Sequence, residues 1–103
     1  MSIKKQFLKS KPVCKVSFKL SSEEAKNADK VQILGDFNKW KTSTKGMNKL
    51  KSGDFSQTLE LESGKEYQFR YLINGEIWVN EPEADGMASN EFNSENSIIS
   101  TKQ

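Results

Sequence analysis

The side chains best suited to recognising a ligand are two tryptophans, one arginine and one asparagine: Trp40, Trp78, Arg70 and Asn96. A flat indole face can cover an apolar C–H patch of a sugar ring, the guanidinium can donate hydrogen bonds to hydroxyl groups, and the amide can both donate and accept them. These residues would form a glycan site if the fold placed them on one surface. The structural alternative is that the tryptophans pack in the core, the arginine is a solvated strand residue and the asparagine orders a turn.

The amino-acid composition argues against a catalytic site or a metal site. The chain has no histidine and a single cysteine, Cys14, which removes intrachain disulfides, cysteine-based zinc sites and the commonest general base. A glycosidase would need two carboxylates held about 5 to 10 Å apart across a substrate cleft, for which so short a chain has little room. Residues 83–86 lack the full ligand spacing of a calcium loop. We therefore expect a non-catalytic protein with no metal and no cofactor.

Length and charge favour one small domain without a nucleic-acid or membrane partner. The chain has 103 residues, of which 34% are hydrophobic and 29% charged. Lysines from Lys4 to Lys19 meet no acid before Glu23, but they are not interleaved with aromatic residues as nucleic-acid binding would require. No apolar run of about seven residues follows Lys4 and Lys5, so no signal peptide is predicted. We expect a cytoplasmic monomer.

Alternation of apolar and polar residues predicts short strands and no long helix. The clearest run is residues 14–20, where the even positions are apolar and Cys14 should be buried. Further strands are expected at residues 30–34, 54–62, 67–73, 77–80 and 97–100. The fold class that follows is an all-β, immunoglobulin-like antiparallel β-sandwich of about seven short strands.

The remaining segments are predicted to be connections. Residues 1–12 are basic and unpatterned, so we expect a flexible arm followed by one domain over residues 13–100. Ser21 and Glu24 have the spacing of a capping box, which supports at most a helical turn. Residues 41–51 and the acidic residues 81–95 are predicted to be loops, with Met47 and Leu50 available to pack onto the sheet.

The first tryptophan ends the stretch from Val31 to Trp40. Its first residues have the alternation of a half-buried strand, and Gly35-Asp36 is a pair that ends a strand and begins a turn. Phe37 and Trp40 are three residues apart on this turn, so both are not expected in one core. We predict that Phe37 anchors the turn and that Trp40 faces outward.

The face of the sheet on which the second tryptophan, Trp78, lies depends on the length of one hairpin loop. A two-residue turn at residues 74–75 would set Trp78 opposite Tyr71, in the core. A three-residue loop over residues 74–76 would set Trp78 opposite Leu72, on the outer face.

We prefer the three-residue loop because of the residues that flank it. It would bury Ile77 and expose Glu76, whereas the tight turn would do the reverse. It would also bring Trp78 near Arg70.

These stretches carry a family resemblance. Residues 35–40, Gly-Asp-Phe-Asn-Lys-Trp, resemble the Gly-x-Phe-Asn-x-Trp signature of family-48 carbohydrate-binding modules. That family includes the glycogen-binding domain of AMP-activated protein kinase beta subunits and the early-set domains of isoamylases and branching enzymes. Residues 69–78 and 96–99 follow in the family's order, so the similarity covers about Val13 to Ile99.

The resemblance implies a function and a set of site residues. It implies non-catalytic binding of α-1,4-glucans such as glycogen or starch fragments, with the binding residues falling on Trp40, Arg70, Trp78, Asn96, Phe92 and Ser94. An arginine stands at position 70 where the family has a lysine, which keeps the charge and changes the hydrogen-bond geometry. The alternative function is a protein-interaction or accessory module that docks on a carbohydrate-active enzyme without binding sugar.

Overall fold

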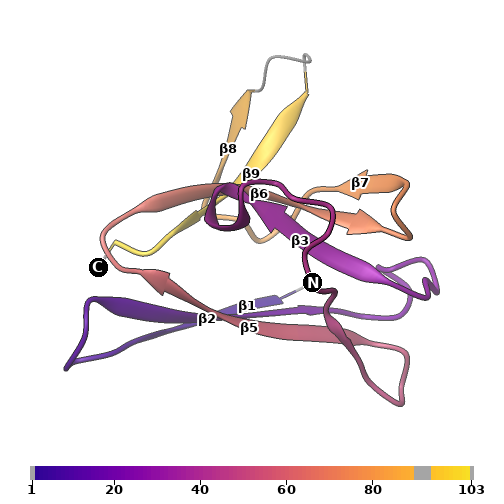
Figure 1. Ribbon diagram of the computed structural model, residues 1–103, viewed down its shortest axis with the longest axis horizontal. Helices are drawn as coiled ribbons and strands as arrows, with labels where there is room; N and C mark the ends of the chain where they lie inside the picture. The colour runs from indigo at the N-terminus through magenta and orange to yellow at the C-terminus, as the bar shows by residue number, and fades with distance from the viewer. Residues whose placement is uncertain (1, 90–93, 103) are drawn as a thin grey trace.

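Two antiparallel sheets face each other in the computed structural model, which describes residues 2–89 and 94–102 (Figure 1). One sheet has the order β1-β2-β5-β4, formed by Ser2–Phe7, Val13–Leu20, Phe55–Glu62 and Asn48–Lys49. The other has the order β3-β6-β9-β8, formed by Val31–Gly35, Glu66–Ile73, Glu95–Ser100 and Gly86–Ser89, and β7 (Ile77–Val79) also pairs with β6. The predicted fold class, an all-β antiparallel sandwich, is confirmed.

Helical structure is nearly absent from the described residues. The one helical segment there is the 3-10 turn η1 (Asp36–Asn38), which lies against β6 (Figure 1). No helix in this part of the chain is long and apolar enough to span a bilayer.

The core lies between the two sheets and follows from strand alternation. In β2 the even-numbered residues are buried and the odd-numbered ones lie nearer to solvent. Opposed residues of an antiparallel pair share a face, so Cys14 meets Leu61 and Leu20 meets Phe55 across β2 and β5. The predicted burial of Cys14 is thereby confirmed.

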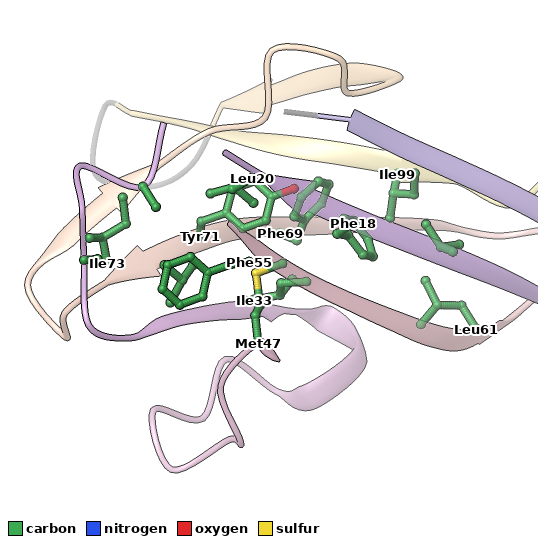
Figure 2. Close-up of a cluster of buried hydrophobic side chains, with 14 of the residues drawn as sticks. Phe18, Leu20, Ile33, Met47, Phe55, Leu61, Phe69, Tyr71, Ile73 and Ile99 are labelled. Carbon is green, nitrogen blue, oxygen red and sulfur yellow. The ribbon is translucent and has the colours of Figure 1, made fainter. Parts of the chain in front are cut away.

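Three aromatic rings form the centre of this core (Figure 2). Phe18 of β2 meets Phe69 and Tyr71 of β6 with ring centroids 5.4 and 6.4 Å apart, in edge-to-face arrangements. Phe69 and Tyr71 are themselves 5.8 Å apart. Such pairs stabilise beyond their buried area by about 0.5–1.5 kcal/mol each. They couple β6, the strand that carries the candidate site, to the opposite sheet.

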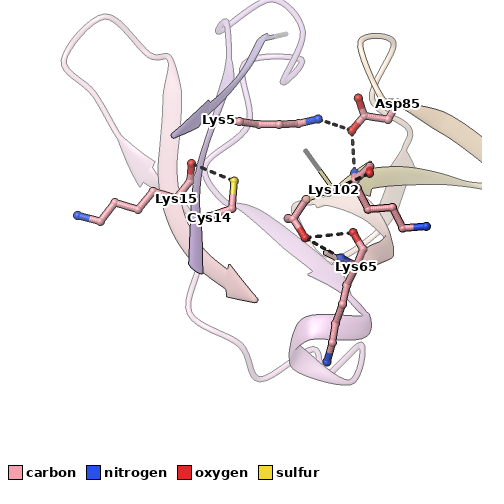
Figure 3. A network of polar contacts seen from close by, with 8 residues as sticks. Lys5, Cys14, Lys15, Lys65, Asp85 and Lys102 are labelled. Carbon is pink, nitrogen blue, oxygen red and sulfur yellow. Dashed lines mark hydrogen bonds and ion pairs between the residues drawn. The ribbon is translucent and has the colours of Figure 1, made fainter. Parts of the chain in front are cut away.

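The prediction of a flexible arm over residues 1–12 is wrong for β1. Ser2–Phe7 pairs with β2 along its whole length, and Ile3 and Phe7 pack against the core. Lys5 stands between them at the remaining odd-numbered position of the strand. Because it is charged, the sequence does not show the alternation of apolar and polar residues that predicts a strand. The ammonium of Lys5 forms an ion pair with the carboxylate of Asp85 at 2.7 Å, and Asp85 directly precedes β8 of the other sheet (Figure 3). The sandwich therefore begins before residue 13.

Two further strands were predicted to be loops. β4 is two residues long with both exposed, and β8 buries none of its four residues, so neither gives an apolar signal. Of the two side chains expected to pack back onto the sheet, Met47 is buried, but Leu50 is 40% exposed.

The predicted capping box is confirmed. The N–H of Ser21 donates to Glu24 Oε1 at 2.9 Å and the N–H of Glu24 donates to Ser21 Oγ at 3.2 Å. The segment that follows forms turns and no continuous helix.

Candidate glycan-binding site

The turn after β3 is built by the residues of the sequence motif. Asn38 holds it closed: its Oδ1 accepts from the N–H groups of Gly35 and Trp40 at 3.0 and 3.2 Å, and its Nδ2 donates to the carbonyl of Ile33 at 2.8 Å. Phe37 turns toward the sandwich, half-buried, with its ring 6.0 Å from that of Tyr67. Phe37 therefore anchors the turn, as predicted.

Gly35 is required at this turn by space. Its backbone is extended (φ −172°), which any residue can adopt. A Cβ at this position, however, would collide with the carbonyl oxygen of Gln68 and lie 2.8 Å from the Cβ of Phe69. Only glycine lets β3 approach β6 this closely.

Trp40 is presented by a strained and well-bonded backbone. Lys39 and Trp40 both have φ of 57°, in the left-handed region that costs a non-glycine residue about 1–2 kcal/mol. The N–H of Trp40 donates to the carbonyl of Gly35 at 3.0 Å, which helps to hold this conformation. Persistence of such strain is typical of functional positions.

Asp36 ties the Trp40 ring to the sheet. Its Oδ1 accepts from Trp40 Nε1 at 3.1 Å and its Oδ2 accepts from the main-chain N–H of Gln68 in β6 at 2.8 Å. One carboxylate thus joins the indole to the strand that carries the rest of the site. Trp40 is half-buried in consequence.

The hairpin between β6 and β7 has the predicted register. Its loop has three residues, with Ile73 opposite Ile77 and Leu72 opposite Trp78. Asn74 and Gly75 adopt positive φ of 51° and 69°, which asparagine and glycine tolerate best. Trp78 consequently lies on the outer face, meaning the face of this sheet that is turned away from the other sheet.

One detail of that prediction is wrong. Ile77 was expected to be buried, but it is 40% exposed. β7 has three residues and, in the described chain, pairs only with β6, so its outer side has no neighbouring strand to cover Ile77.

The two tryptophans meet on the outer face and form a pair, called the tryptophan pair below. The centroids of Trp40 and Trp78 are 6.3 Å apart, with the ring planes tilted by 54°. Trp78 is 40% exposed. Leu34 and Leu72, which share this face with Trp78, are almost fully buried and are not part of the core between the sheets. They form an apolar floor on the outer face.

Arg70 lies beside the pair, as predicted. Its guanidinium carbon is 5.7 Å from the ring centroid of Trp78, a cation–π distance. One terminal nitrogen donates to Ser94 Oγ at 3.4 Å. Its Nε is buried and has no hydrogen-bond partner among the residues that the structure describes.

Asn96 lies on the same face, at the start of β9. Its Nδ2 donates to Gln68 Oε1 at 3.0 Å, and the residue is 9% exposed. Ser97 pairs with Phe69, which places Asn96 and Gln68 on the outer face next to Arg70. Of the six predicted site residues, Phe92 lies outside the described residues.

Three residues that help to build this surface were not predicted: Asp36, Gln68 and Gln32. Gln32 Nε2 donates to the carbonyls of Thr42 and Thr44 at 2.8 and 2.6 Å and holds the loop after Trp40 against the sheet. Strand parity could have found Gln68 and Gln32, because Gln68 alternates outward with Arg70 and Gln32 with Leu34. No sequence signal marks Asp36 as the acceptor of the indole N–H.

A protein-family model matches most of this chain. The family described as the glycogen recognition site of AMP-activated protein kinase matches residues 20–103. Comparison with curated proteins gives no match.

Proposed function

Because this chain belongs to the family described as the glycogen recognition site of AMP-activated protein kinase, we propose that it binds α-1,4-glucans without catalysis. The site is the outer face around the tryptophan pair. The ligand is a glycogen-like or starch-like oligosaccharide or polysaccharide chain.

The observation that carries the proposal is the tryptophan pair, 6.3 Å from ring to ring on one exposed face. Each indole can cover the C–H face of one glucose unit. An α-1,4-linked chain is curved, so two successive units do not lie in one plane. The two indole planes are tilted by 54° where roughly coplanar rings were expected of a glycan site, so a chain that stacks on both rings must follow this tilt.

Polar side chains around the tryptophan pair would select sugars over purely apolar ligands. Arg70 offers donors beside Trp78, and Asn96 offers an amide in the same row. Ser94 and Phe92 are proposed to contribute from the segment next to Asn96. Hydroxyl groups compete with water for such donors, so we expect weak binding in which stacking dominates.

The alternative function is an accessory module that would use the same surface to dock on a protein instead of binding sugar. An apolar patch with both indoles buried would favour a protein partner. Trp78 is 40% exposed and sits beside a cation, which favours a sugar. Docking on a carbohydrate-active enzyme, the monomeric state and the cytoplasmic location remain predictions.

Calorimetric titration with maltoheptaose and with β-cyclodextrin tests the proposal. We expect saturable binding by the wild type, which Trp78→Ala and Trp40→Ala each weaken by about fivefold or more, since a stacked ring contributes about 1–3 kcal/mol. Met87→Ala is the matched control, because Met87 is a large apolar side chain that is 45% exposed on β8. Absence of heat at millimolar sugar with folded wild type would refute glucan binding and favour the accessory role.

A further inference from the structure

The charge of Arg70 is not neutralised within the described structure. No carboxylate in residues 2–89 or 94–102 forms an ion pair with it; its contacts are the Ser94 hydroxyl and the face of Trp78. The side chain is half-buried, and its Nε has no acceptor within residues 2–89 and 94–102. A partly desolvated cation of this kind is stabilised when a ligand brings negative charge.

Two carboxylates in the described part of this sheet and its turn, those of Glu66 and Asp36, are engaged elsewhere. Glu66 is the one acidic residue of β6, lies roughly 13 Å along the strand from Arg70, and contacts the ammonium of Lys102 at 3.9 Å. Asp36 is engaged by the Trp40 indole and by a main-chain N–H of β6.

Two further cations neighbour Trp40 in the sequence. Lys39 and Lys41 flank Trp40 in the sequence and are exposed, and neither has an ion pair with a described residue. A cation therefore lies against the Trp78 ring and two more flank Trp40 in the sequence, while the charged group in contact with the Trp40 ring itself is the Asp36 carboxylate. A neutral glucan would accept hydrogen bonds from Arg70 but would leave its charge without a counter-charge.

We propose that the site recognises a phosphate ester on the glucan, with Arg70 as its main anchor. This inference rests on the proposed function, because the sugar chain must first stack on the tryptophan pair. A guanidinium presents paired N–H groups that match two phosphate oxygens, and charge-assisted hydrogen bonds of this kind are stronger than those to hydroxyl groups. With the guanidinium carbon 5.7 Å from the Trp78 centroid, a phosphate on the rim of the stacked glucose, or on its neighbour, reaches it.

The test compares maltoheptaose with the same oligosaccharide carrying one 6-phosphate, by calorimetry at low and high sodium chloride. We expect roughly tenfold tighter binding of the phosphorylated sugar, as one hydrogen-bonded charge pair provides. High salt should remove most of the preference, because exposed charges are screened. Arg70→Gln should abolish the preference, and Arg70→Lys should retain part of it.

Lys49→Gln is the matched control. Lys49 also places its charge over an aromatic ring, 5.8 Å from the centroid of Phe55, but on the other sheet. This variant should keep the preference for the phosphorylated sugar, and thermal unfolding should verify that every variant is folded.

The outcomes separate the two proposals. Equal binding of both sugars would overturn the phosphate inference and leave glucan binding intact. A preference that survives in Arg70→Gln would overturn the role of Arg70. If neither sugar binds the folded wild type, both proposals fail.

Discussion

Asp36→Ala should weaken glucan binding although its carboxylate need not touch the sugar. The Asp36 carboxylate accepts from the Trp40 indole at 3.1 Å and from the Gln68 main chain at 2.8 Å. Without it the Trp40 ring loses the bond that fixes its tilt against Trp78. The ligand must then order that ring itself.

The magnitudes follow from those two bonds. Each hydrogen bond contributes about 0.5–1.5 kcal/mol, and Asp36 is exposed, so the free energy of unfolding should fall by about 1–2 kcal/mol. Ordering a freed side chain costs about 0.5–1.5 kcal/mol, which corresponds to roughly twofold to tenfold weaker binding of maltoheptaose. The indole N–H of Trp40 should also move upfield in a proton–nitrogen correlation spectrum and exchange faster with solvent.

Asp54→Ala is the matched control for Asp36→Ala. Asp54 also accepts from a main-chain N–H, that of Ser22, at 3.0 Å, but it lies before β5 in the other sheet. It should lose comparable stability and keep the affinity for maltoheptaose. The reasoning is refuted if Asp36→Ala loses stability and binds the sugar as tightly as Asp54→Ala does.

Three further predictions concern the scaffold. Gly35→Ala should destabilise the fold by about 3 kcal/mol in denaturant unfolding, because the new methyl group meets the main chain of β6; Gly86→Ala, whose methyl would make only an ordinary contact, should be nearly neutral. Burial raises the pKa of Tyr67, and burial together with a hydrogen-bonded carboxylate raises the pKa of Tyr71, above the ordinary value near 10. Because the folded-state pKa values exceed the unfolded ones, the contribution of these two rings to stability is complete below about pH 10 and is lost as the pH rises through the folded-state pKa values. Tyrosinate absorbance from Tyr71 should therefore appear only together with unfolding, and ionisation of both rings in folded protein at pH 10 would contradict this. Burial also raises the pKa of the Cys14 thiol, so a disulfide reagent should titrate it only in denaturant, and rapid reaction of the native protein would disprove its burial.

Strand alternation made most of the sandwich predictable. β2 has a strict apolar parity. The three-residue hairpin loop that sets Trp78 outward was also predicted correctly, although the burial of Ile77 on which that choice rested was wrong. Such local patterns carry information because a shift of one residue moves every side chain to the other face.

The failures share a different physical cause. β1, β4 and β8 are edge strands, and such strands need few apolar residues. β1 places Lys5 at an inward parity, because Asp85, distant in the sequence, neutralises its charge. A single sequence does not show which distant side chain will be the partner.

The candidate site also contains features that could be predicted from the sequence and features that could not. The motif predicted Phe37 inward and Trp40 outward, and local geometry accounts for both. Gln68 forms one hydrogen bond with Asp36 and another with Asn96. Each joins segments about thirty residues apart in the sequence, so only the folded chain reveals them.

The most direct test of glucan binding at the tryptophan pair uses the indole N–H signals. The chain has two tryptophans, so two such resonances report on Trp40 and Trp78 separately. On titration with maltoheptaose we predict that both resonances shift saturably and give one dissociation constant. If neither moves while the protein stays folded, or if the sugar perturbs signals elsewhere and leaves both indoles unchanged, the central claim is contradicted.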